Sequence, residues 1–152
     1  RLQLDYALKF GANTELLSGG ADKTVRVWDI PSEKNVVTFA GHEDYVRTLV
    51  RSPTSPNVWF SGGYDHKIIG WDLRTNSSIF TMDHADQLES LLPYPNGTTL
   101  VSAGGPNMQV WDLLSGGISM HTITNHQKSV TSLAFDSKRN RLLSASLDQH
   151  GS

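Results

Sequence analysis

The chain alternates between short apolar segments and clusters of turn-forming residues. In Thr24–Trp28, for example, Val25 and Val27 alternate with polar residues, which is the period-two pattern of a β-strand. The run Pro53–Asn57 has the prolines and the asparagine that commonly separate strands. Read in this way, the sequence predicts strands at Leu4–Phe10, Leu16–Ser18, Thr24–Trp28, Asn35–Phe39, Tyr45–Val50, Val58–Ser61, Lys67–Trp71, Ile79–Met82, Leu88–Leu92, Thr99–Ser102, Met108–Trp111, Ile118–Thr122, Val130–Phe135 and Arg141–Ser144. We therefore expect an all-β fold.

The segments are organised as an internal repeat. The pattern of Ser61–Asp72, with serine, aspartate and a closing Trp-Asp, is copied at the same offsets in Ser18–Asp29. The tryptophans Trp28, Trp71 and Trp111 are spaced by 43 and 40 residues, and the histidines His42, His84 and His126 by 42 and 42. Periods of about 40–45 residues with Gly-His and Trp-Asp punctuation are typical of four-stranded propeller blades.

On these residues the chain resembles the WD-repeat (WD40) family over nearly all of its length. The resemblance implies about three and a half four-stranded blades of a larger, seven-bladed propeller, with units at about 1–40, 41–82, 83–124 and 125–152. The strand edges of such a part need partners, so we expect the 152-residue chain alone not to persist as a stable monomer. Val25 and Val27 are expected to be exposed on its outer flank.

The second unit predicts a buried hydrogen-bonded network. If the strands on either side of the predicted tight turn at 62–65 lie in one sheet, Ser61, Asp65 and Trp71 converge on His42. The indole N–H can donate to the hydroxyl, the hydroxyl to the imidazole, and the imidazole N–H to the carboxylate. Such a network stabilises a fold only when each member is satisfied.

The other units contain incomplete versions of this network. The first has Ser18, Asp22 and Trp28 but no histidine, which we expect to lie before Arg1. The third has a turn at 102–107 that is one residue shorter and lacks the aspartate. We therefore expect His84 to be partnered differently from His42, or to be more exposed.

Overall composition limits the functional classes. The formal net charge is -2 and the pI is about 6.3, which argue against a broad surface for nucleic acid. The absence of cysteine excludes disulfides and thiolate metal sites. No apolar run approaches the roughly 18 residues of a membrane span, and the first residues lack the apolar segment of a signal peptide, so we expect a soluble, intracellular protein.

Several residue patterns have both a chemical and a structural interpretation. Ser61, His42 and Asp65 are the residue types of a hydrolase triad, but their recurrence in successive units favours a structural role. The periodic histidines are expected to lie on different blades, too far apart to share a metal ion. Gly62-Gly63 and Gly104-Gly105 are interpreted as turn glycines, because no Gly-Lys-Ser/Thr follows them. No cofactor, metal or small-molecule substrate is therefore expected.

A more specific resemblance rests on the third unit and the start of the fourth. Asp83-His84, Leu100–Gly105, Val110–Gly117 and Asn125–Thr131 are similar to a family of WD-repeat subunits of the small-subunit processome that are associated with a small nucleolar RNA. The resemblance implies a non-enzymatic nucleolar scaffold for pre-ribosomal RNA transcription and 18S processing. Its expected partners are other WD-repeat proteins of the processome. The scattered cations Lys23, Arg26, Lys67 and Arg74 leave only a weak or indirect RNA contact open.

The same resemblance identifies candidate partner-contact residues. In WD-repeat propellers the residues three and five positions after the repeat histidine line the rim of the narrow face, and tyrosine and arginine are enriched at interface hot spots. In this chain these positions are Tyr45, Arg47, Gln87, Glu89, Ser129 and Thr131. The alternative is that they are ordinary polar loop residues.

A second functional class also fits one short motif. Trp71-Asp72-Leu73-Arg74 matches the Trp-Asp-x-Arg box of substrate receptors for cullin-type ubiquitin ligases, although that motif also occurs by chance in propellers.

Overall fold

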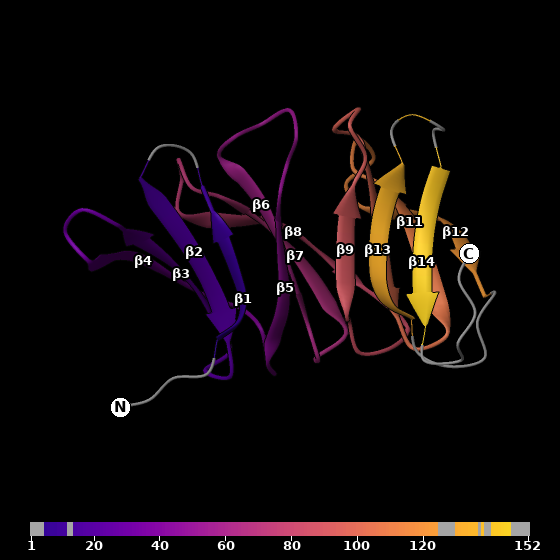
Figure 1. Ribbon diagram of the computed structural model, residues 1–152, viewed down its shortest axis with the longest axis horizontal. Coiled ribbons are helices and arrows are strands. Elements are labelled where there is room, and N and C mark those ends of the chain that lie inside the picture. Colours follow the sequence, from indigo (N-terminus) through magenta and orange to yellow (C-terminus); the bar gives the residue numbers. More distant parts are fainter. Residues whose placement is uncertain (1–4, 12–13, 125–129, 137, 139–140, 147–152) are drawn as a thin grey trace.

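The computed structural model is built entirely from β-strands in the part of the chain that it describes, which is residues 5–11, 14–124, 130–136, 138 and 141–146. Three antiparallel sheets have four strands each, and a fourth sheet has two (Figure 1). The prediction of an all-β fold is confirmed.

Each sheet is formed by strands that are consecutive in the sequence, as expected for antiparallel hairpins. Sheet A contains β1 (Asp5–Phe10), β2 (Glu15–Gly20), β3 (Thr24–Asp29) and β4 (Lys34–Ala40), and sheet B contains β5 (Val46–Arg51), β6 (Val58–Gly63), β7 (Lys67–Asp72) and β8 (Ser77–Asp83). Sheet C contains β9 (Ser90–Pro93), β10 (Thr99–Gly104), β11 (Asn107–Asp112) and β12 (Ile118–Ile123), and sheet D contains β13 (Val130–Asp136) and β14 (Arg141–Ser146). The division of the whole chain into blades of a larger propeller stays a prediction.

The sheets stand side by side in chain order, from the indigo sheet A to the yellow β14 (Figure 1). Their first strands are neighbours: β1 contacts β5, β5 contacts β9, and β9 contacts β13. In each four-stranded sheet the fourth strand is at the opposite edge. The arrangement is a fan, with the first strands at the inner edge and the fourth strands at the outer edge.

The core lies between consecutive sheets. One apolar cluster joins sheets A and B and includes Leu17, Leu49 and Trp59, and a second joins sheets B and C and includes Phe60 and Leu100. Sheet B is covered on both faces, and accordingly β6 and β7 are buried at most positions.

One sequence-based expectation about this core is wrong. Val25 and Val27 are 1% and 4% exposed and belong to the cluster between sheets A and B. Leu8 and Phe10 of β1, in the inner strand of this sheet, are exposed apolar residues. Alternation predicted that the valines share one face, but it could not show that this face is turned towards sheet B.

Two kinds of β-bulge recur in the sheets. In β5 the pairing shifts between Val46 and Thr48, so Arg47 is an extra residue without a pairing partner in β6, and β1 and β13 have the same shift. In the outer strands the extra residues opposite each Trp position are Val36, Ile79 and Met120, and all three are exposed. Because a bulge redirects side chains, the outer strands of sheets A, B and C each present one exposed apolar side chain at the same place.

Candidate functional site

The structure brings His42, Ser61, Asp65 and Trp71 together in one buried network. Trp71 Nε1 donates to Ser61 Oγ over 2.7 Å, and Ser61 Oγ lies 2.7 Å from His42 Nε2. The other ring nitrogen, Nδ1, lies 3.0 Å from Asp65 Oδ2. A carboxylate can only accept, so Nδ1 carries the ring proton and Nε2 accepts from the Ser61 hydroxyl.

The charge state of this network follows from its burial. Burial lowers the pKa of His42, and the negative charge of Asp65 opposes this effect only in part. The ring is therefore neutral near pH 7, as its acceptor role towards Ser61 requires.

Asp65 also fixes two stretches of backbone. Its carboxylate accepts from the Glu43 amide over 2.9 Å and from the Lys67 amide over 3.1 Å. One aspartate thereby joins the connection before β5 to the hairpin between β6 and β7.

The two glycines before this aspartate are not turn glycines, in contrast to the sequence-based interpretation. Gly62 and Gly63 lie in β6, and the left-handed residue of the turn is His66, with φ of 70°. A Cβ on Gly63 would lie 2.5 Å from Asp65 Oδ1 and 2.7 Å from His42 Nδ1. Glycine is therefore needed at position 63 because the network leaves no space for a side chain. In the third unit Gly104 likewise ends β10, whereas Gly105 has a φ of 56° and is a turn glycine.

Sheet A contains the smaller version of the network. Trp28 Nε1 donates to Ser18 Oγ over 2.9 Å. Asp22 accepts from the Thr24 amide, and its Oδ2 lies 2.9 Å from Arg26 Nη2 without the alignment of a hydrogen bond. No histidine of the described residues joins this group, and the expected one remains a prediction.

Sheet C contains a different version. His84 is buried, with Nδ1 at 2.8 Å from Ser102 Oγ and Nε2 at 3.1 Å from the Gly104 carbonyl oxygen. Trp111 Nε1 donates to Ser102 Oγ over 2.8 Å. Of the two alternatives expected for His84, the structure shows the first: the ring has other partners and is not exposed.

A second group of side chains bridges the rim between sheets B and C. Arg47 Nε lies 3.2 Å from Glu89 Oε2, and the Tyr64 hydroxyl donates to Glu89 Oε1 over 3.3 Å. The rings of Tyr45 and Tyr64 have centroids 6.2 Å apart. Burial, with the charge of Glu89 as a smaller cause, raises the pKa of Tyr64, so its hydroxyl remains a donor. We call these four residues the rim cluster.

The rim cluster contains three of the six predicted partner-contact residues and one further residue, and contact with a partner stays a prediction for all of them. Tyr45, Arg47 and Glu89 were predicted, whereas Tyr64 lies in the β6–β7 turn, and no spacing rule pointed to it. Arg47 is held by Glu89 while its side chain stays 38% exposed. The other three predicted residues are less informative: Gln87 is exposed beside the cluster, Ser129 lies outside the described residues, and Thr131 is described only as part of β13.

The rim also has small depressions. One, of about 260 Å³, is lined by His66, Asp86, Gln87, Glu89 and Gly105. Another, of about 230 Å³, is lined by Ala7, Leu8, Lys9, Arg47, Thr48, Leu49 and Glu89. Glu89 borders both of them and so lies at the centre of this surface.

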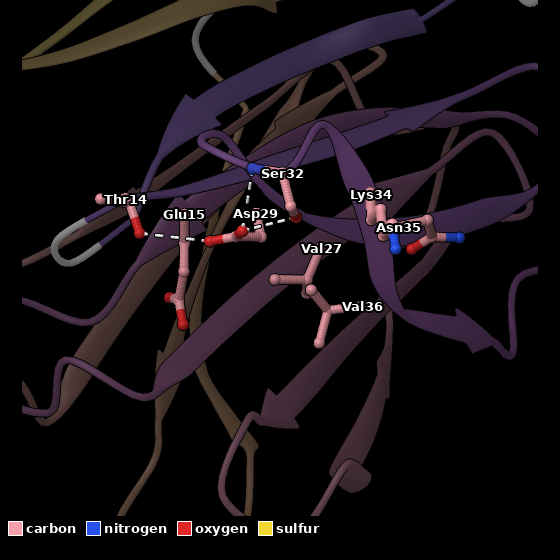
Figure 2. Close-up of a pocket in the computed structure, with 8 residues that line it drawn as sticks. All are labelled: Thr14, Glu15, Val27, Asp29, Ser32, Lys34, Asn35 and Val36. Atoms are coloured by element: carbon pink, nitrogen blue, oxygen red, sulfur yellow. Dashed lines mark hydrogen bonds between the residues drawn. The ribbon is translucent and has the colours of Figure 1, made fainter.

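A groove of about 500 Å³ lies on sheet A (Figure 2). Val27 and Val36 form its apolar part, and Asp29 is turned towards Ser32 and Thr14, from which it accepts hydrogen bonds. The bonds from Ser32 are the main reason why the pKa of Asp29 is lowered. The Asp29 carboxylate is therefore engaged with its neighbouring loops and does not extend freely into the groove.

The aspartate and the arginine of the Trp-Asp-x-Arg motif bind each other. Arg74 Nη2 donates to Asp72 Oδ2 over 3.0 Å, and Arg74 Nε donates to Asp72 Oδ1 over 3.2 Å. These bonds raise the pKa of Arg74 and lower that of Asp72.

Neither a metal cluster nor a membrane-spanning helix is found in the described residues. They contain no group of three or more histidine, aspartate or glutamate side chains that could hold a metal ion. The described part of the chain also contains no helix that is long and apolar enough to cross a membrane.

Comparison with known families supports the repeat pattern. The model described as "WD domain, G-beta repeat" matches residues 6–29, 33–72 and 117–150. The match to residues 33–72 covers β4, the last strand of sheet A, and β5–β7, the first three strands of sheet B. Each sequence repeat therefore begins one strand earlier than the sheet to which most of it belongs. The matched ranges omit residues 73–116, which contain the shortened turn without an aspartate.

Several curated relatives share one name. The chain is 44% identical over 135 residues to the U3 small nucleolar RNA-associated protein 15 homolog of Xenopus tropicalis, covering 89% of this chain and 26% of the relative. It is 45% identical over 140 residues to U3 small nucleolar RNA-associated protein 15 of Schizosaccharomyces pombe, covering 91% of this chain and 28% of the relative. The chain is 44% identical over 108 residues to the human homolog, and this match covers 71% of this chain and 21% of the relative. The chain thus spans about a quarter of the length of these relatives.

Proposed function

The chain belongs to the WD40 repeat family, and from that premise we propose that it is part of a non-enzymatic protein-interaction scaffold of the nucleolar small-subunit processome. Its role is in ribosome biogenesis, through pre-ribosomal RNA transcription and 18S processing. The observation that carries the proposal is the identity of 44–45%, over about nine-tenths of the chain, to proteins named for their association with U3 small nucleolar RNA.

The rim cluster supports a scaffold role. Tyr45, Arg47 and Tyr64 are residue types that dominate the energetics of protein interfaces. Glu89 holds both Arg47 and Tyr64. These side chains are therefore ordered before a partner binds, which reduces the conformational entropy that they lose on binding. We propose that this surface contacts other WD-repeat proteins of the processome.

The charges favour protein over RNA as the direct partner. Arg26, Arg47, Lys67 and Arg74 each form an ion pair with a carboxylate of the same chain. Cations that are already paired release fewer counterions on meeting a phosphate backbone. A direct RNA contact through these residues is therefore weak.

The environment of Ser61 supports a non-enzymatic role. Ser61 is 0% exposed, and its hydroxyl is engaged by both Trp71 and His42. A nucleophile must reach a substrate carbonyl, and this hydroxyl cannot do so without disruption of the sheet.

The cullin-receptor alternative has one motif in its favour and one contact against it. The Trp71–Arg74 box is present, but the Arg74 guanidinium is bonded to Asp72. Purification of the intact protein from cells separates the two functions: a ligase adaptor that co-purifies in stoichiometric amount supports the alternative, and processome subunits support the proposal.

Depletion of the protein in cells provides the functional test. We expect nucleolar localisation and a fall in 18S ribosomal RNA while 28S ribosomal RNA is spared, with recovery when the wild-type gene is restored. Normal 18S levels after efficient depletion would overturn the proposal.

A further inference from the structure

The third unit must replace an aspartate that has several partners in the second. Asp65 accepts from the His42 ring and from the Glu43 amide. The corresponding groups of the third unit are the His84 ring and the Ala85 amide, and within the described part of the chain no carboxylate accepts from either. The His84 ring is buried, and a buried donor without an acceptor is costly, so another atom must accept from it.

Two uncharged oxygens from different strands take these roles. The carbonyl oxygen of Gly104, at the end of β10, lies 3.1 Å from His84 Nε2. The side chain of Gln109, in β11, accepts from the Ala85 amide through Oε1 over 3.2 Å. Gln109 is nearly buried and stands two residues before Trp111, the position that Ile69 occupies in β7. The replacement for the turn aspartate therefore comes partly from the strand.

These contacts determine the tautomer of His84. A backbone carbonyl can only accept, so Nε2 carries the proton. Nδ1 must then accept from the Ser102 hydroxyl, whose oxygen receives the Trp111 indole N–H. In His42 the proton is on Nδ1 and Nε2 accepts. The two histidines are thus opposite tautomers in equivalent places.

We propose that Gln109 and the Gly104 carbonyl together replace the missing aspartate, and that Gln109 is a positioning residue for the start of the segment 84–89, which the bond from the His84 amide to the His66 carbonyl also holds. This segment leads from His84 to Glu89, whose carboxylate holds Arg47 and Tyr64 across the boundary between sheets B and C. The amide of Leu88 in the same segment donates to the Gly63 carbonyl of sheet B over 3.2 Å. Loss of the Gln109 oxygen loosens the start of this segment and leaves the corresponding segment of sheet B unchanged.

The tautomers are measured in the intact protein with ¹⁵N-labelled histidine rings. Long-range ¹H–¹⁵N spectra near pH 7 are expected to show His42 protonated at Nδ1 and His84 protonated at Nε2. The same tautomer at both residues would overturn the proposal. This measurement needs no variant, so it does not depend on whether a substituted protein folds.

The positioning role is measured by hydrogen exchange of two amides. In Gln109→Met, which keeps the shape but removes the acceptor, we expect exchange at the Ala85 amide to accelerate up to about tenfold, while the Glu43 amide is unaffected. Gln109→Glu retains an acceptor oxygen and should restore protection. Gln87→Met, at an exposed glutamine of the same segment, is the matched control and should leave both amides unchanged. An unaltered Ala85 amide in Gln109→Met, or equal acceleration of both amides that Gln109→Glu does not rescue, would overturn the role.

Discussion

The ring of Phe39 stacks on the ring of Trp71, with centroids 4.9 Å apart and planes inclined by 30°. Phe39 belongs to β4 of sheet A and Trp71 to β7 of sheet B. Because Trp71 also donates to Ser61, the contact between the sheets and the histidine network share one side chain. Packing and hydrogen bonding are therefore coupled at this point.

A double-mutant cycle measures this coupling. We expect the effects of Phe39→Leu and Ser61→Ala on the free energy of unfolding to be non-additive by at least about 0.5 kcal/mol, since both act on Trp71. The control pair is Phe39→Leu with Leu100→Ala, which belongs to the cluster between sheets B and C and should give additive effects. Additivity in both pairs would show that the two interactions are independent.

Removal of the network carboxylate should be severe. Asp65→Ala leaves the His42 Nδ1–H and the amides of Glu43 and Lys67 without their acceptor, so we expect a loss of about 3–5 kcal/mol in the free energy of unfolding. Asp83→Ala, at an exposed aspartate, should change stability by less than about 0.5 kcal/mol. Urea unfolding of both variants beside the parent gives the comparison, and equal midpoints would contradict the assignment.

Two tryptophans of the same sheet should respond differently to the same substitution. The indole N–H of Trp59 is buried without a hydrogen-bond partner among the described residues, whereas that of Trp71 donates to Ser61. Trp59→Phe removes an unsatisfied donor, which offsets the lost apolar area, and we expect a change within about 1 kcal/mol. Trp71→Phe should cost about 2 kcal/mol more, because it leaves the Ser61 hydroxyl without its donor. A larger loss for Trp59→Phe than for Trp71→Phe in thermal unfolding would reverse this ranking.

The sequence predicts the strands well because alternation and turn residues are local signals. All fourteen predicted segments correspond to strands whose ends differ by only a few residues, as at Tyr45–Val50 against the observed Val46–Arg51. The convergence of His42, Ser61, Asp65 and Trp71 was accessible because their offsets are repeated.

The rest of the site depends on contacts for which the sequence has no signal. Every residue has a backbone carbonyl, so the sequence does not indicate that the carbonyl of Gly104 accepts from His84. Gln109 occupies a strand position that carries isoleucine in sheet B and arginine in sheet A, so the repeat pattern does not point to it either. Tyr64 joins the rim only because the β6–β7 turn meets the segment that leads into β9. Such cross-sheet relations depend on tertiary geometry.

Mild acid should destabilise the protein through its buried histidines. Burial lowers the pKa of both His42 and His84, so the unfolded chain binds a proton at higher pH than the folded chain. This contribution is complete above about pH 6.5, the ordinary histidine value, and is lost as the pH falls from there towards the lower folded-state values. Urea midpoints measured between about pH 7.5 and 5.5 should fall, and His84→Gln should reduce the slope. A pH-independent midpoint would contradict this.

The rim can be tested with two arginines of one strand. Arg47 joins the rim cluster, whereas Arg51 ends the same strand, β5, at its other end. We expect Arg47→Ala to weaken co-purification of processome proteins by roughly tenfold or more, which corresponds to a hot-spot loss above about 1 kcal/mol, and Arg51→Ala to have little effect. Equal recovery of partners with both variants would place the interface elsewhere.

The connections between sheets have a mechanical consequence. β4 ends at Ala40 and β5 begins at Val46, and within this short link His42 is fixed to Ser61 and Asp65. When the chain is pulled from its two ends, the sheets bear the same force and should unfold one after another. Each unfolding step should release about 40 residues, on the order of 140 Å of extended chain. The link before sheet C is held by two neutral oxygens instead of a carboxylate, so it should yield at a lower force than the link before sheet B.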